Sequence, residues 1–327
     1  MTHRQWLIAL LGCLMFVASG CEREGTSGPA SSGDKKKLYW VQPSKGHPVH
    51  QLTQIAFSEC ARKHGYEPVI IGTDGPDVAG TVALAEQAIG RGDAAGMAVW
   101  TGTPAYNALI ESAGAAGVPV VLPHFPAAEG SVPGARGVIS CDPAQYAIEA
   151  ATEIGKMIGG EGTVAVSQGG FNTTENQVAE TFKKTLNEKF PKVKVLDSIE
   201  EGFDTSAAIA KASALMQSHP DLKAALSTTG GGAVTWANAQ RSAGRKIVIV
   251  AMDYTRQNLD LVRDGEVHAV IGQPLWEESC GAAELLDRGS RGEKIDWWTK
   301  LPAPIIRKDG LDPYYKLLEK VEAAVGR

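Results

Sequence analysis

The chain has 327 residues, of which 43% are hydrophobic and 21% are charged, so it is long enough to bury two separate cores. Its formal net charge is −5, whereas a nucleic-acid-binding domain presents a basic patch, so we expect no nucleic-acid partner. The 37 Gly and 17 Pro follow no fixed period, which excludes the collagen-like and low-complexity classes.

The first twenty residues have the pattern of a secretory signal peptide. Arg4 provides a positive start, residues 6–17 form an apolar core, and small residues precede Cys21. Small residues directly before a Cys resemble the bacterial lipoprotein lipobox, although Ala18 replaces its usual Leu. The resemblance implies cleavage just before Cys21 and a lipid on Cys21 that anchors the protein to the membrane; the alternative is simple cleavage with an unmodified Cys21. Residues 21–37 are rich in Gly, Ser and Lys and predict a flexible tether.

From Leu38 onward, short β-like runs alternate with longer helical patterns, which is typical of βαβ units and parallel sheets. Strands are expected at residues 38–42, 68–71, 96–100, 118–123, 137–140, 163–167, 193–199, 224–228, 247–250 and 268–271. Helices are expected at residues 50–64, 78–91, 105–116, 144–158, 175–190, 206–218, 233–243 and 276–286. Ten strands are many for one sheet and the pattern restarts at Thr163, so we predict an α/β protein with two doubly wound, Rossmann-like lobes.

The stretch from Lys246 to Pro274 predicts a strand, a short helix and a second strand, with a polar side chain after each strand. Asp253 follows the first strand and Gln273 follows the second. Ligands of open parallel sheets bind just outside the carboxyl ends of the strands, so both side chains are candidates for binding. The alternatives are a helix N-cap for Asp253 and a solvated loop end for Gln273.

Five phrases of the chain match one family in the same order, namely VQPSKGHPVHQL, EQAIGRGDAAGMAVW, AGVPVVLPHF, SCDPAQYAIEAATEI, and IVAMDYT with AVIGQP. On these phrases the chain resembles the periplasmic sugar-binding proteins of the ribose- and galactose-binding type, which serve ABC importers. The resemblance covers residues 38–286. It implies two lobes joined by a three-segment hinge, the type I periplasmic binding protein fold, which closes on its ligand.

On this resemblance we expect four parts in the chain. They are a lipoprotein signal peptide at 1–20, a tether at 21–37, an N-terminal lobe at 38–140 plus 274–302, and a C-terminal lobe at 141–273 plus 303–327. The resemblance also implies a monomer in the periplasm or cell envelope, with no enzyme activity and no cofactor.

The resemblance assigns further binding residues. Asp253 and Gln273 match the family's acidic and amide positions, and Phe203 stands where the family places a ring-covering aromatic. Trp100 follows the third strand, where the family usually has Asn. For Phe203 and Trp100 the alternative is packing in the core.

Other positions depart from the family pattern. Asn176 stands near the family's ligand-pairing Arg, and Thr229 replaces its Asn. His47 and His50 occupy a first loop that lacks the family's two aromatics, and His124 lies where the family has Asp-Arg. We therefore expect these three imidazoles to converge in a rebuilt pocket.

The three imidazoles have several interpretations. Neutral rings suit a polyol or furanose, and charged rings suit a carboxylate or phosphate. Zinc is a further alternative, but the three residues lack paired metal-ligand spacing, so we expect no metal. Each His could also be simply solvated.

The remaining cysteines and acid pairs receive structural interpretations. Cys60, Cys141 and Cys280 are expected as buried small hydrophobes rather than a disulfide framework, with a Cys60–Cys280 bridge as the alternative. The pairs Glu200-Glu201 and Glu277-Glu278 are expected on solvated faces.

The sequence therefore predicts an extracytoplasmic solute-binding lipoprotein of an ABC importer. Its ligand would be a small neutral sugar or polyol, and its partners the importer's membrane subunits. One alternative is a ligand sensor that acts on a membrane receptor or kinase. The other is a sugar-processing enzyme that uses His124 and Asp253 as acid and base.

Overall fold

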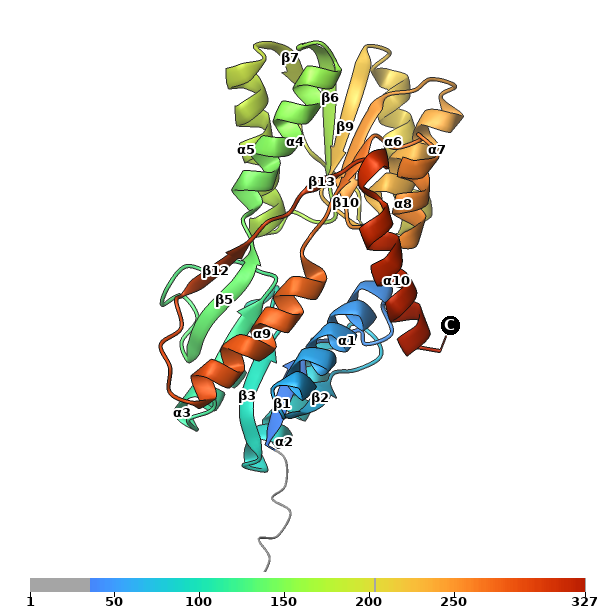
Figure 1. The fold of residues 1–327 in the computed structure, drawn as a ribbon. Coiled ribbons are helices and arrows are strands. Elements are labelled where there is room, and N and C mark those ends of the chain that lie inside the picture. Colours follow the sequence, from blue (N-terminus) through green and yellow to red (C-terminus); the bar gives the residue numbers. More distant parts are fainter. Residues whose placement is uncertain (1–35, 203, 327) are drawn as a thin grey trace, which may run out of the picture. The chain divides into compact units, whose positions relative to one another are not determined.

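The computed structural model describes residues 36–202 and 204–326, which Figure 1 shows as a ribbon. The predicted signal peptide at 1–20, the predicted lipid site Cys21, most of the predicted tether and the predicted ring-covering Phe203 lie outside the described residues. Lys37, which the tether was expected to include, is the first residue of a strand instead.

The first lobe is built on a six-stranded sheet, here called sheet A, in which every neighbouring pair is parallel. Its order is β12-β5-β4-β3-β1-β2. Its strands are β1 (Lys37–Val41), β2 (Glu67–Ile71), β3 (Ala94–Val99), β4 (Val120–Pro123), β5 (Ala135–Cys141) and β12 (Trp298–Leu301).

The second lobe is built on a seven-stranded sheet, here called sheet B, of order β13-β11-β10-β9-β6-β7, with β8 paired to β6. Its pairs are parallel except that β13 runs antiparallel to β11. Its strands are β6 (Glu161–Gln168), β7 (Lys192–Val195), β8 (Ile199–Glu200), β9 (Leu222–Ser227), β10 (Val248–Met252), β11 (Ala269–Ile271) and β13 (Ile305–Ile306). The predicted α/β class with two doubly wound lobes is confirmed.

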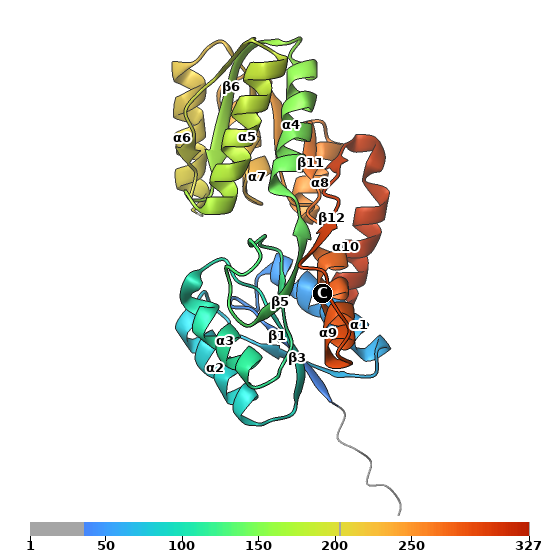
Figure 2. The same cartoon turned by 90° about the vertical axis from the view of Figure 1, so that its left-hand side faces the viewer.

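The helices cover both faces of each sheet (Figures 1 and 2). They are α1 (Pro48–Lys63), α2 (Val78–Gly90), α3 (Asn107–Ala115), α4 (Pro143–Met157), α5 (Thr173–Lys189), α6 (Thr205–Ser218), α7 (Gly232–Ser242), α8 (Arg256–Arg263), α9 (Leu275–Ser290) and α10 (Asp312–Ala324), with 3-10 turns at Pro104–Tyr106 and Lys308–Gly310. Within the described residues, no helix combines the length and the apolar character needed to cross a membrane.

Successive side chains of β1 contact helices on opposite faces of sheet A. Leu38 and Trp40 belong to the core that includes residues of α1 and α9, whereas Tyr39 and Val41 belong to the core that includes residues of α2 and α3. Successive strand residues point to opposite faces, so a strand buried on both faces is apolar throughout. This explains why the buried strands could be recognised as continuous apolar runs.

The chain passes between the two sheets three times, after β5, after β11 and after β12. Helix α10 then contacts elements of both lobes. Lys320 Nζ lies 2.6 Å from Glu59 Oε2 on α1, and the Tyr315 hydroxyl donates to Asp260 Oδ1 on α8 at 2.7 Å. The C-terminal helix therefore joins the lobes on the side of α1 and α8.

The predicted elements end at residue 286, so β12, β13 and α10 were missed. β12 and β13 have only four and two residues and are largely half-buried, which leaves no apolar run to recognise. α10 did carry a signal, because Pro313 in its first turn precedes the spaced apolar residues Leu317, Leu318 and Val321. The strand expected at 193–199 is divided into β7 and β8.

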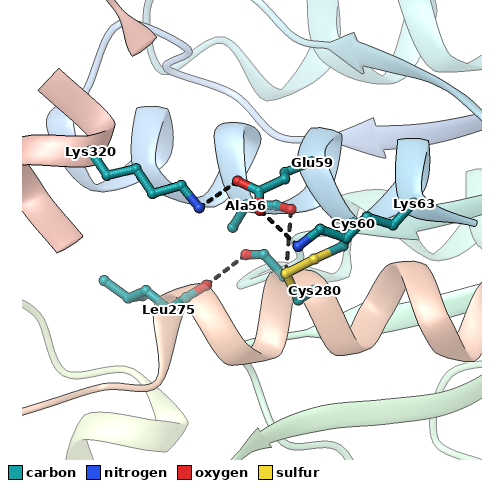
Figure 3. The surroundings of a disulfide bond; sticks show 8 residues. Ala56, Glu59, Cys60, Lys63, Leu275, Cys280 and Lys320 are labelled. Carbon is teal, nitrogen blue, oxygen red and sulfur yellow. Dashed lines mark hydrogen bonds and ion pairs between the residues drawn. A yellow bond between two sulfur atoms is a disulfide. The ribbon is translucent and has the colours of Figure 1, made fainter. Parts of the chain in front are cut away.

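Cys60 and Cys280 form a disulfide that joins α1 to α9 (Figure 3), so the expectation that they are merely small hydrophobes is wrong. Their Cα atoms lie 5.2 Å apart, although 220 positions separate them in the sequence. The alternative, a Cys60–Cys280 bridge, is confirmed. It was not preferred because the pairing depends on two helices that the folded sheet brings together. Cys141 is buried and free, as expected for a small hydrophobe.

Candidate functional site

The loops after β1, β3 and β4 place most of the predicted imidazoles at the carboxyl edge of sheet A. The residues there form a row of rings: His47 lies 5.1 Å from His50, His50 lies 5.6 Å from Trp100, and Trp100 stacks on His124 with ring centroids 4.1 Å apart. Phe125 packs edge-on against His124 at 4.7 Å. The structure thus brings the three imidazoles together, with Trp100 between two of them.

The tautomer of His50 follows from its contacts. Its Nδ1 lies 2.8 Å from the carbonyl oxygen of Pro43 and 3.1 Å from that of Ser44. Carbonyl oxygens only accept, so Nδ1 carries the proton and donates. Burial lowers the pKa of His50 to about 4. The ring is therefore neutral at pH 7, and its Nε2 is a hydrogen-bond acceptor.

His124 is oriented by a buried acid. Its Nδ1 lies 3.0 Å from Oε1 of Glu278, which comes from the first turn of α9 and is completely buried. The expectation of a solvated face for Glu278 is wrong, because α9 packs this turn against the first lobe. Burial raises the pKa of Glu278, and its Oε2 has no hydrogen-bond partner among the described residues.

Gln42, directly after β1, is a site residue that the sequence analysis missed. It is completely buried, and its Oε1 accepts from Trp40 Nε1 at 2.9 Å and from Thr53 Oγ1 at 3.2 Å. These bonds direct the amide nitrogen Nε2 away, and it finds no partner in the described part of the chain. The rule that selected Asp253, a polar residue after an apolar strand, applies equally to Gln42.

On the edge of sheet B, Asp253 follows β10 and is only 9% exposed. Burial raises its pKa to about 6, and its Oδ1 has no partner within the described residues. A Cβ on Gly230 would lie 2.6 Å from Asp253 Oδ2, so this carboxyl needs glycine beside it. The N-cap alternative is wrong, because Thr255 rather than Asp253 caps α8.

The other predicted residues of the second lobe have mixed surroundings. Asn176, in the first turn of α5, accepts through Oδ1 from Gln168 Nε2 at 3.2 Å, and Gln168 ends β6. Thr229 is nearly buried, and its Oγ1 accepts from the amide of Gly231 at 3.2 Å. Gln273 is half-buried just before α9, where the chain returns to the first lobe.

Glu201 supports this edge from beneath, so its expected place on a solvated face is also wrong. It is 3% exposed, and its Oε2 accepts from Ser167 Oγ at 2.7 Å and from Ser227 Oγ at 2.9 Å. Trp236 Nε1 in turn donates to Ser167 Oγ at 2.9 Å. This network holds the carboxyl ends of β6 and β9 together.

Phe171, in the loop after β6, is an aromatic side chain that the sequence analysis did not consider. It is 57% exposed and lines a cavity of about 240 Å³ together with Gln168 and Asn176. A large exposed ring beside polar side chains at a strand end is a candidate to cover the apolar face of a ligand.

Backbone strain is concentrated at these loops. The non-glycine residues with positive φ among those described are Ser44 (56°), His124 (77°) and Asp253 (70°), after β1, β4 and β10 respectively. Such a conformation is costly for a residue with a side chain and clusters at functional sites. These positions follow strands of both sheets, where the candidate site residues lie.

The zinc alternative finds no support in this geometry. Across residues 36–202 and 204–326, no group of three or more His, Cys, Asp or Glu side chains is arranged to hold a metal ion.

Comparisons with known proteins agree with this architecture. A family model described as "Periplasmic binding protein domain" matches residues 38–294. The ribose import binding protein RbsB of Bacillus subtilis (strain 168) is 24% identical over 293 residues, which cover 88% of this chain and 93% of that protein.

Two solved structures illustrate the similarity of fold. A sugar ABC transporter (sugar-binding protein) from Bacillus halodurans superposes with a TM-score of 0.80 at 22% identity, covering 85% of this chain and 100% of that one. AraP, an arabinose binding protein from Geobacillus stearothermophilus, gives a TM-score of 0.78 at 23% identity, with 86% and 99% covered.

Proposed function

We propose that this chain, which belongs to the periplasmic binding protein domain family, binds a small polyhydroxylated ligand of the sugar class between its two lobes. As a member of this family it is an extracytoplasmic binding protein and not an enzyme. In the proposed role it delivers its ligand to the membrane subunits of an ABC importer. It acts as a monomer held at the membrane by a lipid on Cys21.

One observation carries the proposal: buried polar atoms without partners lie after β1, after β10 and in the first turn of α9. Gln42 Nε2, Glu278 Oε2 and Asp253 Oδ1 are each buried without a hydrogen bond in the described residues. A buried polar group without a partner costs about 1–3 kcal/mol, so a site that keeps several of them is suited to a ligand that satisfies them. Hydroxyl groups can do so, because each both donates and accepts.

The names of similar proteins support the sugar class and the importer. The relatives and structures compared above are named for ribose import, for a sugar ABC transporter and for arabinose binding. Phe171, exposed in the loop after β6, adds an aromatic face that can cover the apolar side of a sugar ring. Trp100 is 7% exposed and packs between His50 and His124.

The proposed binding mode is closure of the two lobes about the three crossing segments. Asp253, Asn176 and Thr229 bind from the second lobe, His50 and His124 bind from the first, and Gln273 binds beside the crossing into α9. The ligand then bridges the lobes, so its binding energy offsets the cost of bringing them together. Chemistry at His124 and Asp253 is not required.

The test is a thermal-shift screen of the mature protein with pentoses, hexoses and cyclic polyols, followed by titration calorimetry on each compound that raises the melting temperature. A ligand at 100 times its dissociation constant adds about 2.7 kcal/mol to the free energy of unfolding. The compound must also be recovered unchanged. Absence of any shift across the panel, or conversion of a compound to product, would contradict the proposal.

A further inference from the structure

We infer that the site selects a sugar-class ligand that carries a protonated amine, namely an amino sugar, and rejects a sugar acid. The inference rests on the proposed function and specifies its ligand class. It follows from the hydrogen-bonding atoms that the site leaves open and from the charges around them.

Among the polar atoms of the site that have no hydrogen-bond partner, acceptors outnumber donors. Asp253 Oδ1 and Glu278 Oε2 are buried carboxyl oxygens without partners, and Gln42 Nε2 is a buried donor without one, within the described residues. The contacts of His50 Nδ1 leave its Nε2 as a further acceptor. The complementary ligand is therefore rich in donors, and an ammonium group brings three donors and no acceptor.

The open carboxyls belong to one electrostatic cluster. His124 contacts Glu278 at 3.0 Å, and the charges of His124 and Glu278 both act on Asp253. The ring row connects this cluster to His50 through Trp100. A ligand held against His124 is thus close to the carboxyl of Glu278.

In the described part of the chain, one imidazole, that of His124, faces the two carboxyls of this cluster. Within the described residues, neither Asp253 nor Glu278 forms an ion pair with Lys or Arg. Arg256, three residues after Asp253, pairs instead with Glu322 on α10 at 2.7 Å. Buried charges are normally paired, so a cationic group on the ligand would supply the missing partner.

A carboxylate on the ligand would have the opposite effect. It would add a negative charge beside two buried carboxyls, and like charges in a poorly solvated site disfavour one another. The neutral imidazole of His50 offers an acceptor lone pair there and not a positive charge. The site therefore discriminates among ligands of one ring scaffold by the charge of a single substituent.

The experiment compares four substituents on matched scaffolds by titration calorimetry at pH 7. For glucose, galactose and mannose, the parent sugar is compared with its 2-amino, 2-N-acetylamino and uronic acid counterparts. We expect at least one amino sugar to bind at least tenfold more tightly than its parent. The N-acetyl form removes the charge at the same atom and should lose this gain, and the acid should not bind.

Charge variants show which carboxyl is responsible. Glu278→Gln should reduce the ratio of amino-sugar to parent-sugar affinity by at least fivefold. Glu277→Gln, an exposed neighbour on the same helix, is the matched control and should leave the ratio unchanged. An equal fall of the ratio in both variants would overturn the assignment to the buried carboxyl.

The outcomes separate the inference from the proposed function. If neutral sugars or polyols bind and no amino sugar binds more tightly than its parent, the inference is overturned and the proposed function stands. If a uronic acid binds most tightly, the inference is overturned in the same way. If no compound of either panel binds, both are overturned.

Discussion

The strand ends of the two lobes are built on different principles. On sheet A, a row of rings extends from His47 to His124. A disulfide joins α1, which carries His50, to α9, which carries the acid that orients His124. On sheet B, the edge depends on carboxyls held by hydroxyl donors, such as Glu201 with its two serines. The first lobe thus supplies apolar faces and fixed lone pairs, whereas Asp253 of the second supplies a carboxyl that burial makes costly to ionise.

The largest effect on stability is expected when the disulfide between Cys60 and Cys280 is removed. Replacing both Cys60 and Cys280 with Ser opens a loop of more than 200 residues, which should cost about 4–5 kcal/mol in the free energy of unfolding. Urea unfolding with intrinsic fluorescence measures the loss. Ligand affinity should also fall, because α1 and α9 together position His50 and Glu278.

Reductant provides the control for this prediction. The wild-type protein should lose comparable stability in dithiothreitol. The stability of the double variant should not change, because Cys141, the cysteine that remains within the described residues, forms no disulfide. Equal stability of wild type and double variant would show that the first lobe does not depend on its disulfide.

The second prediction concerns the carboxyl of the other lobe. Burial raises the pKa of Asp253 to about 6 from a usual value near 3.8, so keeping it ionised at pH 7 costs on the order of 1–3 kcal/mol. Asp253→Asn should therefore raise the free energy of unfolding of the unliganded protein at pH 7. It should also weaken ligand binding roughly 10–100-fold, because a charged hydrogen-bond acceptor is lost.

The raised pKa of Asp253 determines how its contribution to stability changes with pH. The folded protein binds the Asp253 proton more tightly than the unfolded chain does, so this group destabilises as pH rises from about 4 to 6, and its cost is complete above 6. The advantage of the Asn variant should shrink as pH falls from 7 toward 4. Asp197→Asn, at a fully exposed acid of the same lobe, should change stability by less than about 0.5 kcal/mol.

The third prediction tests the opposite pH response of the first lobe. The pKa of His50 is about 4 in the folded protein and near 6.5 when unfolded, so its contribution to stability is lost as pH falls from 6.5 to 4. His50→Asn keeps a donor toward the Pro43 and Ser44 carbonyls but does not titrate. As pH falls from 6.5 to 4.5, the free energy of unfolding of this variant should rise by about 1–2 kcal/mol relative to that of the wild type. Parallel pH profiles of the two proteins would contradict the neutral, buried ring.

Most of the fold could be predicted from the sequence because the strands of both sheets are buried on two faces and therefore form continuous apolar runs. Asp253 could be predicted as a site residue because a polar residue after such a run lies at a sheet edge. It did not reveal Glu278, since nothing in the phrase WEESC indicates which of two adjacent acids α9 turns inward. The short strands β12 and β13 were missed, and the disulfide was predicted only as an alternative, for a related reason, because neighbours distant in the sequence determine them.

The smallest effect concerns how Glu278 acts on His124 when the ligand is neutral. Glu278→Gln keeps the shape of the side chain but replaces the carboxyl partner of His124 Nδ1 by an amide, so the affinity for a neutral parent sugar should fall about tenfold, or about 1.4 kcal/mol. His124→Gln should cost as much or more. If Glu278 works by orienting His124, adding Glu278→Gln to that variant should cost little further affinity. Additive losses in this double-mutant cycle would instead mean that Glu278 acts on the neutral ligand through its own contact alone, and that the ring row of the first lobe is oriented without it.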